Sequence, residues 1–213
     1  METKSALKIR DLHFSHSKRE LFKGVNLEIG SHEFVTVMGK NGCGKSTLIS
    51  LLLGALIPDR GQIQFWGGNR EKFSRQIGWV VSEREFYPPF FKVSQLMKEL
   101  ARFYPSWDEN LERRLCEGFR IDVNKDLSTL SLGESAKVKL IKAIAIRPKL
   151  VILDELTANL DPESKQLITR ELIDLFASCE EMSVLYVSHS DEEALRLSDR
   201  VLHLDSNGLK ESA

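Results

Sequence analysis

The chain has 213 residues, with 30 lysines and arginines against 31 aspartates and glutamates. This length allows one large domain or one domain with a subdomain, and the near-zero net charge gives no reason to expect binding to nucleic acid or acidic lipid. No apolar stretch approaches the roughly 20 residues that span a bilayer, and the N-terminal residues lack the apolar block of a signal peptide. We therefore expect a soluble, cytosolic chain that binds no nucleic acid.

Apolar runs bounded by turn residues predict strands, and apolar repeats at helical spacing predict helices. We expect strands near residues 8–14, 25–29, 34–38, 62–66, 77–81, 150–153, 184–187 and 200–204. We expect helices near residues 45–53, 93–103, 108–119, 134–147, 163–177 and 191–197. Ser106, Ser131 and Ser190 each stand three residues before a glutamate, which is the pattern of a helix capping box. Asp161-Pro162 predicts an N-cap followed by proline at the first helical position.

These elements are unevenly distributed along the chain. The first part is rich in strands, residues 93–126 are helical, and the last part alternates strand and helix. Alternation predicts a parallel sheet with crossover helices, and the helical middle predicts a subdomain inserted into that core.

The loop between the strand at 34–38 and the helix at 45–53 carries a phosphate-binding pattern. Gly39, Gly44, Lys45 and Ser46 fit G-x-x-x-x-G-K-[ST]. Glycines let successive N–H groups turn around phosphate oxygens, and the helix N-terminus adds partial positive charge. Lys45 adds a full charge, and the Ser46 hydroxyl is suited to ligate Mg²⁺. The alternative, a glycine-rich turn that binds nothing, is disfavoured by the flanking strand and helix. The predicted nucleotide-binding residues here are Gly39, Lys40, Asn41, Gly42, Cys43, Gly44, Lys45, Ser46 and Thr47.

The cysteines are odd in number and form no C-x-x-C pair. Cys43, Cys116 and Cys179 are the three. This usage suits a reducing compartment and argues against a disulfide framework or a zinc site.

A second set of candidate residues follows the strand at 150–153, which ends in Asp154-Glu155. Ligands of open parallel sheets bind at the carboxyl ends of the strands. We therefore expect Asp154 beside the phosphate loop, near the Mg²⁺ held by Ser46, and contacting the metal directly or through water. Glu155 would accept a proton from an attacking water. The alternative is a surface acidic pair that simply follows a core strand.

Two further motifs are ambiguous on residue chemistry alone. His189 follows the strand at 184–187 and could bond a γ-phosphate or the catalytic carboxylate, but a lone histidine there is more often a hydrogen-bonded surface residue. Ser131-Leu132-Gly133-Glu134 precedes a long helix, and this pattern by itself favours an ordinary helix cap.

Taken in order, these segments resemble the nucleotide-binding subunits of ATP-binding-cassette (ABC) proteins over nearly the whole chain. Residues 130–134 (LSLGE) are similar to the family's signature motif, with Leu132 where a second glycine is common. Residues 158–161 (ANLD) are similar to the segment that crosses the dimer interface, and His189 to the switch histidine. The resemblance implies an α/β P-loop NTPase core with a mostly parallel sheet, an N-terminal antiparallel β subdomain and an inserted α-helical subdomain. It implies one domain over 1–213, with a core of 1–81 and 150–213, and a helical subdomain of about 82–149 carrying the signature.

The resemblance also implies a mechanism that uses two chains. ATP and Mg²⁺ on the phosphate loop of one subunit would be covered by Ser131, Gly133 and Glu134 of another, with Asp161 at the interface. Water held by Glu155 would attack, with charge neutralised by Lys45 and His189. The implied partners are a second ATPase subunit, identical or closely related, and a separate membrane-spanning transporter subunit. The chain would then lie on the cytoplasmic face of the membrane through that partner.

Some positions depart from the family pattern. His16 stands where an aromatic residue usually stacks on adenine, which predicts looser base selectivity. Ser82 stands where a glutamine usually contacts Mg²⁺; either Glu83 substitutes for it or the coupling is weak. Residues 86–91 (FYPPFF) form an aromatic run that either docks a membrane subunit or packs within the helical subdomain.

Three functions follow from these observations. The first is an ATPase subunit of a membrane transporter, with a likeness to small export-type bacterial members in residues 77–87 and 103–107. The second is a soluble ABC ATPase that does not transport. The third is a nucleotide-gated binding module that barely turns over, which the departures at Ser82 and His16 motivate.

Overall fold

The computed structural model describes residues 5–16, 19–82, 87–205 and 208–211. Its larger sheet has the strand order β5-β6-β7-β3-β8-β9. These strands are β3 (Phe34–Met38), β5 (Ile77–Val80), β6 (Leu150–Asp154), β7 (Ser183–Val187), β8 (Arg200–Asp205) and β9 (Gly208–Glu211). The pairs from β5 to β8 are parallel, and only β8–β9 is antiparallel among the described strands of this sheet. The expected mostly parallel sheet is therefore confirmed.

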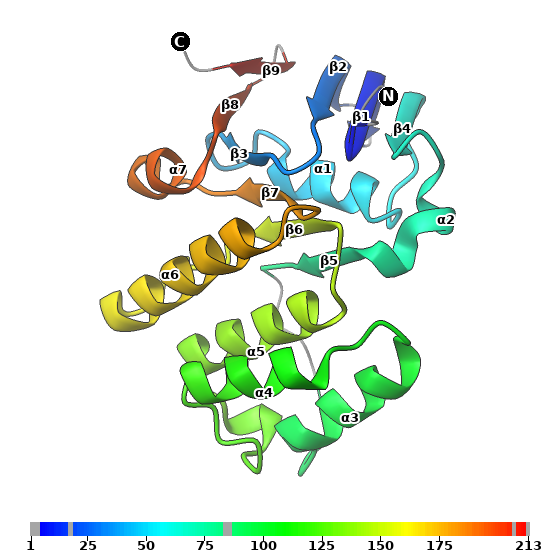
Figure 1. Cartoon of the computed structure of the whole chain (residues 1–213). Coiled ribbons are helices and arrows are strands. Elements are labelled where there is room, and N and C mark those ends of the chain that lie inside the picture. Colours follow the sequence, from blue (N-terminus) through cyan, green and yellow to red (C-terminus); the bar gives the residue numbers. More distant parts are fainter. Residues whose placement is uncertain (1–4, 17–18, 83–86, 206–207, 212–213) are drawn as a thin grey trace.

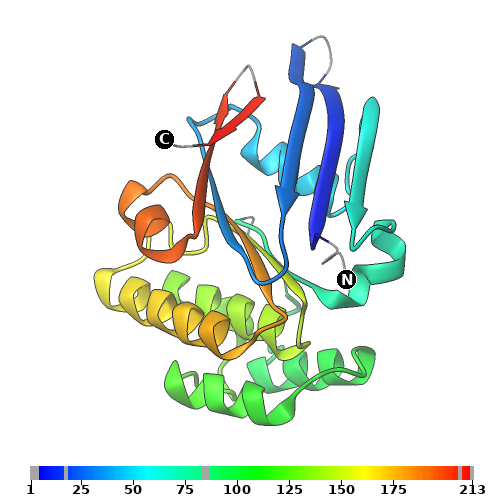
Figure 2. The same cartoon turned by 45° about the horizontal axis from the view of Figure 1, so that its top comes forward.

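A smaller antiparallel sheet has the order β2-β1-β4. It comprises β1 (Leu7–His16), β2 (Arg19–Ile29) and β4 (Arg60–Phe65). Both views show it standing beside the larger sheet, with β9 next to β2 (Figure 1, Figure 2). This is the predicted N-terminal antiparallel β part of an α/β fold.

Most of the helices lie on the two sides of the larger sheet. The helices are α1 (Lys45–Leu52), α2 (Arg70–Phe73), α3 (Val93–Phe103), α4 (Glu109–Gly118), α5 (Leu132–Ala145), α6 (Pro162–Ser178) and α7 (Asp191–Leu197). Figure 1 shows α3, α4, α5 and α6 stacked below the larger sheet, while α1 lies on the other side with the small sheet. Within the described residues, no helix combines the length and apolar character that a bilayer crossing requires.

Strand β6 shows how the sheet separates these layers. Leu150 and Ile152 belong to the apolar cluster with α1 and the small sheet, whereas Val151 and Leu153 belong to the cluster with α5 and α6. Successive side chains of a strand point to opposite faces, and both faces are covered here. The sequence of this strand is therefore an unbroken run of apolar residues, without alternation of apolar and polar residues.

Some details of the sequence prediction were wrong or incomplete. Ser106 is not an N-cap: its hydroxyl donates to Ile146 O (2.7 Å), and Asp108 caps α4 by accepting from Leu111 N (2.8 Å). Strand β2 begins at Arg19 rather than near residue 25, because its first half already pairs with β1, from His16–Arg19 to Phe14–Phe22. The short α2 and β9 were not predicted.

Candidate functional site

Strand β3 and helix α1 hold the phosphate loop, residues 39–47. All five residues of β3 are buried, and the loop ends at Gly44, which has φ 110° and is the residue before α1. A side chain on Gly39 would lie 2.6 Å from both Leu204 O and Cys43 Sγ. These two positions therefore require glycine, one for its backbone angle and one for lack of space.

Lys45 lies at the first turn of α1 with its side chain only 6% exposed. Its Nζ donates to Gly39 O (2.8 Å) and Lys40 O (3.4 Å) and lies 3.9 Å from Glu155 Oε1. The ammonium is thus held over the loop from which it comes, between the loop and the end of β6.

A pocket of about 420 Å³ opens over this loop. It is lined by Leu21, Asn41, Gly42, Gly44, Lys45, Ser46, Thr47, Ser82 and Glu155. Leu21 of β2 was missed by the sequence analysis because β2 was predicted to start after it. His16, predicted to stack on a base, is exposed at the end of β1 and is not among the residues lining this pocket.

The end of β6 brings oxygen donors to the same place. Asp154 is 4% exposed and accepts a hydrogen bond from Ser82 Oγ (3.0 Å). Burial raises the pKa of Asp154, and the bond from Ser82 opposes that rise. One cavity is lined by Ser46, Ser82 and Asp154 together.

This donor set fits Mg²⁺. Two hydroxyls and one carboxylate are oxygen ligands, and Mg²⁺ commonly takes few protein ligands beside water and phosphate. The described residues contain no cluster of three or more His, Cys, Asp or Glu side chains that could hold a metal ion. Glu83, the alternative ligand, lies outside the described residues.

Two predicted catalytic groups lie side by side. His189 Nδ1 lies 3.6 Å from Glu155 Oε1, and Glu155 N donates to Val187 O (2.9 Å) across the ends of β6 and β7. His189 is 58% exposed, and both side chains line a pocket that also includes Gly39 and Lys40. The parallel register, in which Asp154 pairs with Val187, sets this proximity.

The signature residues form a closed cap at the start of α5. Glu134 N donates to Ser131 Oγ (3.2 Å), and Ser131 N donates to Glu134 Oε2 (2.8 Å). Lys125 Nζ donates to both oxygens of Glu134, at 2.9 and 2.7 Å, and this contact lowers the pKa of Glu134. The backbone N–H groups of Ser131 and Glu134 are thus engaged within the cap, while Leu132 is 71% exposed.

Asp161 and Gly133 meet where α6 begins. Asp161 caps α6 by accepting from Ser164 N (2.9 Å), as predicted from Asp161-Pro162. A side chain on Gly133 would lie 2.6 Å from Ser164 Oγ and 3.5 Å from Asp161 Oδ2. The signature and the Asp161 segment are therefore packed together within one chain.

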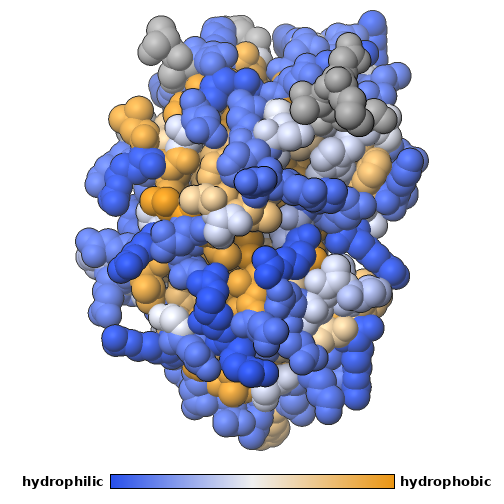
Figure 3. All heavy atoms as spheres, in the orientation of Figure 1, coloured by the Kyte–Doolittle hydropathy of each residue, from blue (hydrophilic) through white to orange (hydrophobic). Residues whose placement is uncertain are grey.

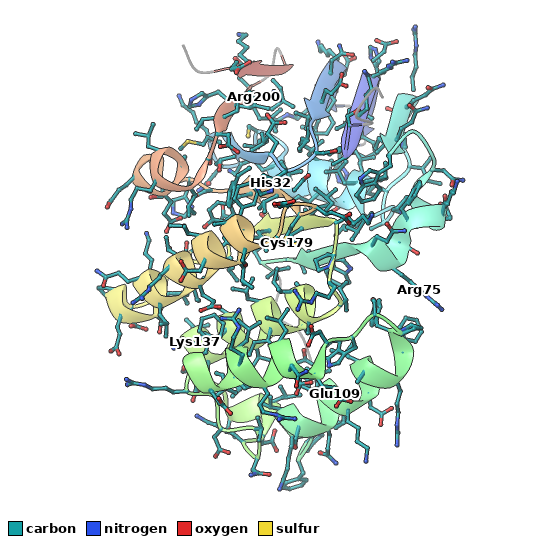
Figure 4. The ribbon with its side chains drawn as sticks, in the orientation of Figure 1. His32, Arg75, Glu109, Lys137, Cys179 and Arg200 are labelled. Atoms are coloured by element: carbon teal, nitrogen blue, oxygen red, sulfur yellow. The ribbon has the colours of Figure 1, made fainter. Side chains whose placement is uncertain are left out.

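The cavity lined by Ser46, Ser82 and Asp154 has a volume of about 820 Å³ and extends as a cleft between α1, β5 and the end of α3. Its aromatic lining is Trp79, Phe103 and Tyr104, with Arg70 and Arg75 beside them. Figure 4 shows Arg75 leaving the segment before β5 and pointing away from the sheet. On the face of the molecule drawn in Figure 3, apolar side chains reach the surface in several places, most extensively around the middle, among mainly polar ones.

The aromatic run predicted at 86–91 divides. Tyr87 lines a pocket together with Ser131 and Leu132 of the signature. Phe91 packs against the helical core, and Phe90 is 85% exposed. Phe86 lies outside the described residues.

The comparisons with known proteins agree with this geometry. The family described as "ABC transporter" matches residues 22–158. The spermidine/putrescine import ATP-binding protein PotA of Spiroplasma citri is 28% identical over 99% of this chain and 62% of its own length. The energy-coupling factor transporter ATP-binding protein EcfA1 of Leuconostoc mesenteroides is 30% identical over 92% of this chain and 76% of its own length. The chain thus spans less than two thirds of the PotA protein that it matches.

A solved ATP-binding subunit of an ABC transporter has the same fold, with a TM-score of 0.87 and 23% identity over 98% of this chain and 90% of that one. CbiO1 of Clostridium perfringens, described as part of the complex cbiONQ, gives a TM-score of 0.78 at 23% identity over 97% of this chain and 87% of that one. The relatives named here are import and energy-coupling proteins, so the likeness to export-type members stays a prediction. With a family match over more than half of its length, this chain belongs to the ABC transporter family, as an ATP-binding member.

Proposed function

We propose that this chain is an ATPase subunit that binds and hydrolyses ATP and thereby powers a separate membrane-spanning transporter. The observation that carries this proposal is the convergence of three groups at the phosphate loop. Lys45 Nζ lies 3.9 Å from Glu155 Oε1, and His189 Nδ1 lies 3.6 Å from the same oxygen. Phosphoryl transfer to water requires groups that neutralise charge, accept a proton and hydrogen-bond the phosphate. The cation, the carboxylate and the imidazole can supply these beside a loop of backbone N–H donors.

In this mechanism the residues of the loop bind the triphosphate through backbone N–H groups, and the Lys45 ammonium neutralises its terminal charge. Glu155 orients the attacking water and takes its proton, and His189 donates a hydrogen bond to the γ-phosphate. Ser46 and Asp154, with Ser82, are the residues suited to hold Mg²⁺, which when bound supplies further charge neutralisation. Leu21 contributes apolar contact at the mouth of the pocket.

The signature serves a second copy, or a close relative, of this chain. Ser131, Gly133 and Glu134 would cover the nucleotide bound to the phosphate loop of that partner, and Asp161 would lie at the interface. Two observations support this arrangement. Leu132 is 71% exposed at the tip of the cap. The cavity beside the signature reaches Asp154 and Glu155, but among the described residues none of 39–47 lines it.

The membrane subunit would dock in the cleft lined by Trp79, Phe103 and Tyr104. Exposed aromatic side chains beside Arg70 and Arg75 suit an apolar helix end that carries acidic residues. Ser46 and Ser82 line both this cleft and the phosphate-loop pocket, so the proposed docking site and the nucleotide site share two residues. The chain would then lie on the cytoplasmic face of the membrane, with about residues 82–149 acting as a helical subdomain of a single domain over 1–213.

One observation favours the alternative of a nucleotide-gated module with little turnover. Ser82 occupies an oxygen of Asp154 through a 3.0 Å hydrogen bond, where a longer side chain could reach the metal itself. Slow turnover that persists when the membrane partner is present would support this alternative.

Phosphate release from Mg-ATP by the full chain tests the proposal. Glu155→Gln should reduce release by about 10²–10⁴-fold, because it removes the general base, while ATP binding stays within a few-fold. Glu192→Gln is the matched control, since it makes the same change in a side chain that is 82% exposed. Hydrolysis that persists in Glu155→Gln, or that is absent in the wild-type chain, would contradict the proposal.

A further inference from the structure

A buried carboxylate lies behind the candidate catalytic groups, between the loops that follow β6 and β7. It belongs to Glu193 in the first turn of α7, and its side chain is 7% exposed. A buried carboxylate is strongly unfavourable unless its oxygens are paired and hydrogen-bonded. The burial of Glu193 therefore requires partners for both of its carboxylate oxygens.

Four side chains from different parts of the fold hold Glu193. Thr157 Oγ1 donates to Oε1 (2.7 Å), and Lys165 Nζ of α6 lies 2.8 Å from the same oxygen. Tyr186 OH of β7 donates to Oε2 (2.9 Å), and Ser188 Oγ donates to that oxygen as well (3.2 Å). Thr157, Tyr186 and Ser188 are themselves 6%, 1% and 3% exposed.

Glu193 is ionised in this setting. Burial raises the pKa of Glu193, but hydrogen bonds from Lys165, Thr157 and Tyr186 together bring it below the ordinary value. Burial, together with the charge of Glu193, raises the pKa of Tyr186, so the phenol stays neutral and keeps its proton to donate. One negative charge is thus shared by four donors in a water-poor place.

The donors connect Glu193 to both catalytic candidates. Thr157 is two residues after Glu155, in the loop after β6, and Ser188 immediately precedes His189. Ser188 Oγ also accepts from Ser190 N (3.0 Å), which fixes the far side of the histidine loop. Lys165 N donates to Asp161 O (3.0 Å), so the Lys165 contact reaches the Asp161 segment too.

We propose that Glu193 is a positioning residue that fixes the Glu155 loop and the His189 loop relative to each other, so that both groups meet the same phosphate. This inference rests on the proposed function. Glu193 touches no residue of the phosphate loop 39–47 in the contacts described above, so it acts on the groups that perform hydrolysis and not on those that bind nucleotide. The 3.6 Å separation of Glu155 and His189 is what it maintains.

The test compares Glu193→Gln with Glu192→Gln in the full chain. The introduced glutamine has nearly the same shape as Glu193 but carries an amide donor where hydroxyl donors point, and it loses the charge that pairs with Lys165. We expect kcat for ATP hydrolysis to fall about tenfold or more while KM for ATP stays within about twofold, because misplacing catalytic groups slows the reaction without removing binding contacts. Glu192→Gln, at an exposed neighbour in the same helix, should leave both constants unchanged.

Thr157 provides a second, independent pair of variants. Thr157→Val removes the hydroxyl at constant shape and should lower kcat, whereas Thr157→Ser keeps the hydroxyl and should retain most of it. Combining Thr157→Val with Glu193→Gln should lower kcat by much less than the product of the two single effects, because both remove the same connection.

The outcomes separate the two claims. If the variants unfold at lower temperature but the folded protein keeps the wild-type kcat, Glu193 is only a structural residue and the inference is wrong. If Glu193→Gln raises KM with unchanged kcat, the inference is also wrong. A wild-type chain that does not hydrolyse ATP overturns the proposed function itself, and this inference with it.

Discussion

The phosphate-loop region and the signature region of this chain differ in how complete they are. The phosphate loop is assembled inside one chain: Lys45 is buried, held by the carbonyls of Gly39 and Lys40, and faced by Glu155. The signature cap is also internally bonded through Ser131 and Glu134, but its tip residue, Leu132, is exposed.

This difference indicates that the two regions have different binding partners. Under the proposed function, the phosphate loop presents the charge of Lys45 and its backbone donors to a ligand, whereas the signature presents an exposed apolar tip, Leu132, to another molecule. Under the proposed function, changes in the first region should alter ATP binding by the isolated chain, and changes in the second should alter only what happens when two chains meet.

The largest expected effect is that of Lys45→Ala. Removing the ammonium from the phosphate pocket should reduce hydrolysis by about 10²–10³-fold, since it deletes a preorganised charge at the reacting phosphate. Affinity for ATP should fall as well, by about ten- to a hundredfold. Titration with a fluorescent ATP analogue and phosphate release measure the two effects. Wild-type affinity for ATP in this variant would contradict the role given to the phosphate loop, because that loop would then not be the element that binds ATP.

Alkylation of Cys43 tests the same region by a different route. Cys43 Sγ packs where a side chain on Gly39 would stand, so a carbamidomethyl group there should distort the loop and block ATP binding. Bound Mg-ATP should protect the thiol. Burial raises the pKa of Cys116 to about 11, which keeps it unreactive, and Cys179→Ser removes the other partly exposed thiol. Unchanged ATP affinity after complete modification would refute this prediction.

Leu132→Asp should affect only the signature region. A carboxylate at this exposed tip would be repelled by a triphosphate, so we expect hydrolysis to fall about tenfold while the isolated chain binds ATP as before. Ile57→Asp is the control, because it places the same charge at a side chain that is 84% exposed elsewhere. An equal loss of hydrolysis in both variants, or weaker ATP binding in Leu132→Asp, would contradict separate roles for the signature and the phosphate loop.

The smallest effect concerns the Lys125–Glu134 pair beneath that tip. Lys125→Met should lower the free energy of unfolding by less than about 1 kcal/mol, as for other partly exposed ion pairs. The pKa of Glu134 is lowered by the Lys125 hydrogen bond. The stabilisation is therefore present above the ordinary carboxyl pKa and lost as the pH falls towards the lowered value. Denaturant unfolding at neutral and acid pH should show the effect of Lys125→Met shrinking in acid, with exposed Lys98→Met as control. A larger effect in acid would contradict this assignment.

Sequence patterns predicted most of what lies at the carboxyl edge of the sheet. Gly39, Lys45, Asp154, Glu155 and His189 were identifiable because each follows an apolar run or fits a fixed spacing, and the parallel register brings such ends together. Their roles in catalysis stay predictions.

Contacts between distant segments were not predictable in the same way. Leu21 was missed because the first half of β2 places the adjacent apolar residues Leu21 and Phe22 between polar ones, so it shows no apolar alternation. Glu193 was read only as the last residue of a capping box, yet its side chain binds Thr157, Lys165, Tyr186 and Ser188 instead of the Ser190 backbone. A charge in the first turn of a helix gives no local signal that it is buried among groups far along the chain.

Sedimentation of the Glu155→Gln variant tests most directly whether the phosphate loop of one chain and the signature of another enclose one nucleotide. With Mg-ATP the account predicts a dimer that disappears on chelation of Mg²⁺ and when either Lys45→Ala or Leu132→Asp is added. A chain that stays monomeric at saturating Mg-ATP, or a dimer indifferent to both substitutions, would contradict it.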